Sequence, residues 1–235
     1  MAEIFEEISA AYERAYKSNQ EIQRLVEKLA KGSAKYTDAW RYAEIDGMLS
    51  SQAALRSAEA LLSAADAYPD IMEFLNRCCH TPVTEYTQGV QALLNKKNGI
   101  SLSSLTADFD ANRASGIAHN VAHAEGLDEI NKMLGPSLRN FTENTVSNTI
   151  AKNAEFQSSV GLRPQIRRIA DPRCCTWCDE VAGTYDYDKL VRGDDVWRRH
   201  DNCRCIIEFH PGPGYKRITA QSRSSESRGI RIISQ

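Results

Sequence analysis

Cysteine and histidine side chains gather in the last third of the chain in a pattern typical of a metal site. Cys175-Thr-Trp-Cys178 is followed by His200-Asp-Asn-Cys203-Arg-Cys205. Two cysteines separated by two residues on a tight turn can direct both thiolates at one ion, as they do in tetrahedral zinc sites. The spacing therefore predicts one structural Zn²⁺ ion with the following candidate ligands: Cys175, Cys178, His200, Cys203 and Cys205.

A tetrahedral zinc ion has fewer coordination positions than there are candidate ligands, so more than one ligand set is possible. The first combines Cys175 and Cys178 with His200 and Cys203, and a second replaces His200 with Cys205. Cys174 is a further candidate. Disulfides formed in a mature particle, or thiols that bind nothing, are the alternatives to zinc. A redox role for the Cys-x-x-Cys pair would require a helix that follows a strand in a βαβ unit, and no such unit is visible.

The size of the surrounding segment favours a metal. Residues 161–210 contain few large apolar side chains, and a core of about 50 residues is marginal without a metal or disulfide. Zinc contributes folding free energy on the order of 10 kcal/mol in comparable peptides. We therefore expect a small subdomain that is held together by zinc.

Two other groups of residues resemble catalytic sites. His119 and His123 lie one helical turn apart, like the histidines of a metalloprotease, but Asn120 stands where the glutamate that acts as general base is required. Several aspartates near His200 could hold magnesium in a nuclease. These are Asp186, Asp188, Asp194, Asp195 and Asp201. No set of nucleophile, base and orienting residue can be identified, so a role without catalysis is expected and a metal-dependent nuclease or hydrolase is the alternative.

The chain before this region is expected to be helical, because apolar residues recur at steps of three and four. Expected helices span 3–31, 36–67, 70–78, 84–96, 102–113, 115–134 and 137–160, and expected strands span 163–169, 203–209 and 229–233. The predicted fold is mainly α, with a long-helix N-terminal domain and a small α+β or β-hairpin subdomain stapled by zinc. The predicted domains are a helical domain at 1–160, a Cys/His subdomain at 161–210 and a basic, extended or flexible tail at 211–235.

Composition narrows the class of protein. Hydrophobic residues make up 42% of the chain and charged residues 26%, which is typical of a soluble protein with a buried core. No apolar run approaches the roughly 18 residues of a membrane-spanning helix, and the acidic N-terminus is unlike a secretory signal. We therefore expect a cytoplasmic protein with no membrane partner.

Charge is distributed unevenly along the chain. The net charge is −2, with acidic residues in excess before residue 160 and basic residues in excess after it. This mild bias favours a solvated basic surface, and a DNA-binding accessory protein is a further alternative. The arginines that could contact DNA or an acidic partner are Arg163, Arg167, Arg168, Arg198, Arg199 and Arg217.

Residues Asn140–Phe209 resemble the Mu F-like phage head morphogenesis family, also called minor head or minor capsid proteins. The resemblance rests on a helix with Phe141-Thr-Glu-Asn144, on Cys174-Cys-Thr-Trp-Cys178, on Ala182-Gly-Thr-Tyr-Asp-Tyr187 and on Arg198-Arg-His-Asp-Asn-Cys-Arg-Cys205. It is closest to the branch found in prophages of Gram-positive bacteria.

This resemblance implies a virion or assembly protein that is not an enzyme. Members are encoded beside the portal gene, enter the procapsid in low copy number and contact the portal, the scaffold and packaged DNA. The implied location is the host cytoplasm during assembly and the virion head afterwards. The implied partners are the phage portal and other capsid or scaffold proteins, with packaged DNA contacted through basic C-terminal residues.

Overall fold

The computed structural model describes residues 2–56, 68–190, 195–199 and 203–210. These residues form a mainly helical protein with a small antiparallel sheet near the C-terminal end, which confirms the predicted fold class. The helices are α1 (Ala2–Ser18), α2 (Gln20–Ala30), α3 (Tyr36–Arg56), α5 (Tyr68–Lys97), α6 (Ala111–Ala122), α7 (Leu127–Ser159) and α8 (Thr176–Glu180). The strands are β1 (Gln165–Ile169), β2 (Gly183–Asp186) and β3 (Ile206–His210), and a short 3-10 helix, η2 (Tyr187–Lys189), follows β2.

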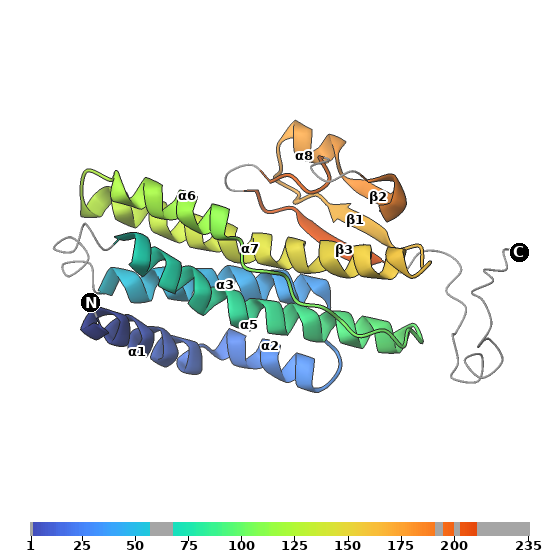
Figure 1. Ribbon diagram of the computed structural model, residues 1–235, viewed down its shortest axis with the longest axis horizontal. Helices are drawn as coiled ribbons and strands as arrows, with labels where there is room; N and C mark the ends of the chain where they lie inside the picture. Colours follow the sequence, from blue (N-terminus) through green and yellow to red (C-terminus); the bar gives the residue numbers. More distant parts are fainter. Residues whose placement is uncertain (1, 57–67, 191–194, 200–202, 211–235) are drawn as a thin grey trace, which may run out of the picture.

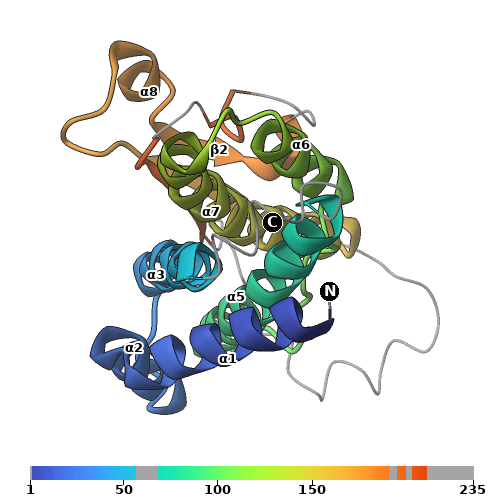
Figure 2. The ribbon, with the colours of Figure 1, turned by 90° about the vertical axis from the view of Figure 1, so that its left-hand side faces the viewer.

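The long helices run along the long axis of the molecule, with α1 and α2 on one side and α7 on the other (Figure 1). The sheet and α8 lie beyond α7, on the side away from α1 and α2, and the end-on view shows the same order (Figures 1 and 2). No helix within the described ranges is both long enough and apolar enough to cross a membrane.

Helices α3 and α7 pack closely against each other. A Cβ atom on Gly47 would lie 2.8 Å from the Cα atom of Arg139, so glycine permits this approach. Beside this contact the Thr142 hydroxyl donates a hydrogen bond to the carbonyl of Ala43 at 2.7 Å. The two helices therefore form one support for the C-terminal region.

The sheet has the order β2-β1-β3, with both pairs antiparallel. Gln165 lies opposite Asp186 on one side and His210 on the other. Ile166 and Phe209 belong to the same buried cluster as Trp40 of α3 and Val146 of α7. Hydrophobic packing is therefore continuous between the helices and the sheet, while the predicted division into domains at residue 160 stays a prediction.

The first predicted helix is divided into two. The side-chain oxygen of Asn19 accepts hydrogen bonds from the amides of Glu21 and Ile22, so Asn19 caps α2 and α1 ends before it. The predicted end near Gly32 is confirmed, because this glycine has a φ of 71°, the left-handed conformation that helix C-termini favour. The prediction of a single helix was wrong because it overlooked this internal cap.

Two of the predicted gaps between helices are absent, and a proline lies in each. Pro82 lies inside α5, which merges the helices predicted at 70–78 and 84–96, and Pro136 lies inside α7. Proline removes one backbone hydrogen bond, but apolar side chains are buried on both sides of each proline and favour a continuous helix. Leu134 and Leu138, for example, are 1% and 0% exposed. The predicted helix at 115–134 is instead α6, and α7 begins at Leu127.

The helix predicted at 102–113 was also wrong, because residues 101–110 form a segment without helical structure. Asn153 of α7 holds this segment by accepting a hydrogen bond from the amide of Leu105 and donating one to its carbonyl. Asn95 donates to the carbonyl of Leu102 in the same way. These side chains replace the backbone partners that a helix would supply, and α6 then begins after its cap, Asp110.

The C-terminal strands are close to their predicted places. The strand predicted at 163–169 is β1, and the strand predicted at 203–209 begins slightly later as β3. The end of the helix predicted at 36–67, the strand predicted at 229–233 and the tail predicted at 211–235 lie outside the described residues.

Candidate metal centre

Three buried thiols meet where α8 faces the segment that leads into β3. The Sγ atoms of Cys178, Cys203 and Cys205 all lie within 4.8 Å of one another. Those of Cys178 and Cys203 are 3.7 Å apart, well beyond the roughly 2.05 Å of a disulfide bond. No other group of three metal-binding side chains occurs in the part of the chain that the structure describes. These three cysteines could therefore bind a metal ion.

The other predicted ligands are placed differently. Cys175 is the N-cap residue of α8 and is exposed, so it lies near Cys178 in sequence but outside the group of three. Cys174 is half-buried and packs against the group. His200 lies outside the described residues. Of the ligands in the second predicted set, Cys178, Cys203 and Cys205 lie together and Cys175 does not.

The short helix α8 differs in its effect on the two thiols of the Cys-x-x-Cys pair. The backbone amide of Cys178, which faces the sulfur of Cys175, holds the pKa of Cys175 below its ordinary value. Burial raises the pKa of Cys178 to about 12, although a hydrogen bond from Arg168 opposes this rise. A metal ion would relieve the cost of burying this sulfur, because the ion replaces the proton of the thiol and neutralises the thiolate.

Hydrogen-bond donors surround the three sulfurs. The Nη2 atom of Arg168 lies 3.6 Å from the Cys178 sulfur and 3.8 Å from the Cys203 sulfur. The amide of Asp171 lies 3.5 Å from the Cys205 sulfur. Donors of this kind orient metal ligands and stabilise thiolates. These donors therefore oppose the effect of burial, which favours the neutral thiol, and they would stabilise thiolates bound to a metal ion.

Arg168 is held rigidly in this position. It is 2% exposed, and its Nη1 atom donates to the carbonyls of Val196 and Arg198, both at 2.8 Å. Its guanidinium also lies over the ring of Trp177 at 5.4 Å. The sequence analysis missed this role, although the alternation of β1 gave a signal, because Arg168 shares a sheet face with the buried Ile166.

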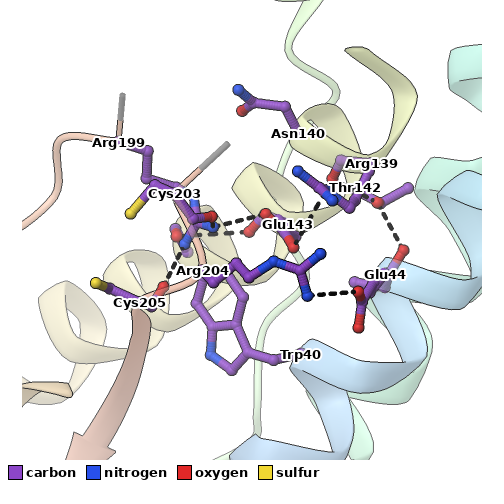
Figure 3. A network of polar contacts seen from close by, with 12 residues as sticks. Trp40, Glu44, Arg139, Asn140, Thr142, Glu143, Arg199, Cys203, Arg204 and Cys205 are labelled. Atoms are coloured by element: carbon purple, nitrogen blue, oxygen red, sulfur yellow. Dashed lines mark hydrogen bonds and ion pairs between the residues drawn. The ribbon is translucent and has the colours of Figure 1, made fainter. Parts of the chain in front are cut away.

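Cys203, Arg204 and Cys205 form a short segment before β3, here called the hook, that carries two of the three thiols. The side chain of Arg199 donates to the carbonyls of Cys203 and Cys205, each at 2.7 Å, and pairs with Glu143 of α7 at 2.6 Å (Figure 3). The sequence analysis did not identify Glu143 as part of the site. The one signal was that Glu143 belongs to the Phe141-Thr-Glu-Asn144 segment of the family resemblance, but its pairing with Arg199 joins residues that are far apart in the chain.

Two of the arginines that were expected to contact DNA have buried side chains and are therefore not accessible to it. Arg168 and Arg199 both point into the protein, which corrects that expectation for them. Arg163, Arg167 and Arg198 are exposed, and Arg217 lies outside the described residues.

The paired histidines of α6 do not form a metal centre with a third described ligand. His119 and His123 are exposed and their ring centroids lie 4.2 Å apart. Nδ1 of His123 is 2.7 Å from the carbonyl of His119, so this nitrogen already has a partner on its own helix.

The acidic residues considered for a nuclease are separate from one another. Asp186 pairs with Lys189, Asp195 pairs with Arg198, and Asp188 accepts a hydrogen bond from Ser158. Asp194 and Asp201 lie outside the described residues, as His200 does. Within the described ranges, carboxylates do not gather as the thiols do.

A groove between α7 and residues 107–112 extends to Trp197 and is also lined by acidic side chains. Asp108 pairs with Lys152 at 2.8 Å, and Asp110 caps α6. These carboxylates therefore hold the segment before α6 and the helix in place, and they lie outside the thiol cluster.

Comparisons of the chain with protein-family models, with curated proteins and with solved structures found no match.

Proposed function

We propose that this chain is a phage minor head protein, a component without catalytic activity that acts in head morphogenesis at or near the portal. The proposal rests on the resemblance of Asn140–Phe209 to the Mu F-like family. Its proposed partners are the portal and other capsid or scaffold proteins. Its proposed location is the host cytoplasm during assembly and then the virion head.

Within this function, we propose that Zn²⁺ stabilises the C-terminal region. The observation that carries this step is the buried cluster of Cys178, Cys203 and Cys205, which come from two separate segments. Thiolates are soft ligands that favour zinc, and a reducing cytoplasm keeps cysteines available for metals. Cys175 or a histidine would complete a tetrahedral site.

Burial supports a structural metal over a catalytic one. Cys178 and Cys205 are 0% and 1% exposed, and Cys203 is 4% exposed. A catalytic zinc ion keeps one position open to water or substrate, whereas a structural ion is enclosed by protein ligands. An enclosed ion at these sulfurs would fix the hook to α8 and so maintain a rigid surface for docking.

Metal content gives the direct test of the zinc site. Protein purified from a reducing cytoplasm is expected to contain one zinc ion per chain by elemental analysis. Cys178→Ser should lose that zinc, while Cys79→Ala, at a buried cysteine of α5, should keep it. Absence of zinc from the parent protein, or unchanged zinc in Cys178→Ser, would refute the structural-zinc proposal.

Assembly gives the test of the head-protein role. Co-expression with the portal protein encoded beside it should yield a complex that survives size-exclusion chromatography, and the chain should be found in purified procapsids. Incubation with DNA and Mg²⁺ should produce no cleavage. Cleavage would support the nuclease alternative, and salt-sensitive DNA binding without portal binding would support the DNA-binding alternative.

A further inference from the structure

The backbone of the hook is held by the side chain of Arg199, which forms no hydrogen bond to any of the three thiols. Arg199 reaches the carbonyls of the two cysteines in the hook, at 2.7 Å each. These two bonds fix the backbone on both sides of Arg204. Because the carbonyls are fixed, the sulfurs of Cys203 and Cys205 are directed at Cys178.

Arg199 is itself anchored to the helices. Its Nη2 atom lies 2.6 Å from a carboxylate oxygen of Glu143 on α7, and its guanidinium lies 4.7 Å from the ring centroid of Trp40 on α3. The side chains of Arg199 and Glu143 are only 5% and 11% exposed. Figure 3 shows these contacts joining the hook to both helices.

The same helices also hold the strand that follows the hook. Nε1 of Trp40 donates to the carbonyl of Ile207 at 2.7 Å, immediately after the start of β3. Arg139, one turn before Glu143 on α7, lies 3.9 Å from the same carboxylate group. The segment that carries two of the three thiols is therefore anchored to α3 and α7 through Arg199 and β3.

We propose that Arg199 is the positioning residue of the thiol site and that, through Glu143, it couples metal binding to α3 and α7. Arginine suits this role, because its planar fork can serve two carbonyls and a carboxylate at once. Coupling between sites is reciprocal, so a metal held by the thiols also stabilises the helix surface around Glu143. This inference rests on the proposed zinc site.

Zinc affinity measured by competition with a chromophoric chelator tests the positioning role. Glu143→Gln and Arg199→Lys are each expected to weaken zinc binding by about 10- to 100-fold, the range seen when groups that orient metal ligands are removed. Arg204→Gln is the matched control, because this arginine belongs to the hook and also pairs with a helix, at 3.6 Å from Glu44 of α3, but its side chain is 53% exposed. An ion pair at the surface contributes little. Arg204→Gln should therefore bind zinc as the parent does.

Amide hydrogen exchange of the parent protein and of Glu143→Gln tests the reciprocal effect. Adding zinc to the metal-free protein should slow exchange in α7 around Glu143, and Glu143→Gln should reduce this protection. If the parent binds zinc but Glu143→Gln and Arg199→Lys bind it equally well, the coupling is refuted and the zinc site stands. If the parent binds no zinc, both proposals are refuted.

Discussion

Cysteines gather at two places in this protein, and their surroundings differ. Cys78 and Cys79 lie on α5 inside the helical part, whereas Cys178, Cys203 and Cys205 lie between α8 and the sheet. Cys79 and Cys178 are both 0% exposed. Depth of burial therefore does not distinguish a core thiol from a candidate metal ligand.

The neighbours of the sulfurs do distinguish them. Cys79 donates a hydrogen bond to the Ser50 hydroxyl, and burial together with the charge of Asp46 raises its pKa well above the ordinary value. Cys178 instead receives a hydrogen bond from the guanidinium of Arg168. Burial raises the pKa of Cys178 as well, but the cationic donor opposes this rise, whereas the carboxylate beside Cys79 adds to it.

The largest expected effect concerns the metal itself. Cys178→Ser should abolish zinc binding and remove stabilisation on the order of 10 kcal/mol, the scale of structural zinc sites. Cys79→Ala should retain zinc and lose only about 1–2 kcal/mol through the small cavity it leaves. Urea denaturation with and without a chelator measures both. A chelator that leaves the parent's denaturation midpoint unchanged would contradict the expected difference.

The second prediction concerns Asp46, the carboxylate that faces the helical cysteines. Burial raises its pKa to about 7, despite a hydrogen bond from Tyr12 that opposes the shift. Between its ordinary value near 4 and about 7, the folded protein thus binds more protons than the unfolded chain. The stabilisation that protonated Asp46 contributes to the free energy of unfolding is fully present below pH 4 and is lost as the pH rises through 7.

Asp46→Asn should remove this pH dependence. Between pH 5 and 8 the parent is expected to lose roughly 3 kcal/mol of unfolding free energy relative to the variant, at about 1.4 kcal/mol per pKa unit. Urea denaturation of both proteins at the two pH values gives the difference, in which contributions from other groups cancel. A parallel pH dependence in the two proteins would show that Asp46 ionises normally in the fold.

Hydrophobic periodicity predicted most of the helical architecture, because each long helix buries one continuous face. It failed where a side chain replaces a backbone partner, as Asn153 does for Leu105. It also failed where proline is tolerated inside a helix, at Pro82 and Pro136. In these places tertiary contacts outweigh the local preference, and such contacts are not visible in a sequence window.

Cysteine spacing named five candidate ligands, and the three thiols that meet are among them, because closely spaced pairs often bind one ion. It could not identify the residues that hold them. Glu143 and Arg199 pair across the boundary between helices and sheet, and that contact depends on how α7 packs. The spacing also left the fourth ligand undecided, and zinc itself stays a prediction.

The smallest predicted effect separates the charge of Arg168 from its packing. Arg168→Met should weaken zinc binding by about 10- to 100-fold, because the donor to two thiolates is lost. The metal-free protein should also lose about 1–3 kcal/mol of stability, because the carbonyls of Val196 and Arg198 lose their donor. Arg167→Met is the matched control, since Arg167 is the adjacent residue of β1 and is exposed.

Zinc titration and chelator-treated urea denaturation of both variants measure the two effects separately. A purely structural arginine would lower the stability of the metal-free protein and leave the zinc affinity of the folded protein unchanged. Weaker zinc binding in addition to lower stability in Arg168→Met, with neither change in Arg167→Met, is expected if the guanidinium acts on the sulfurs. Equal zinc affinities in Arg168→Met and Arg167→Met would show that the hydrogen bonds from Arg168 do not stabilise the bound metal. The contrast between this cluster and the thiols of α5 would then be lost.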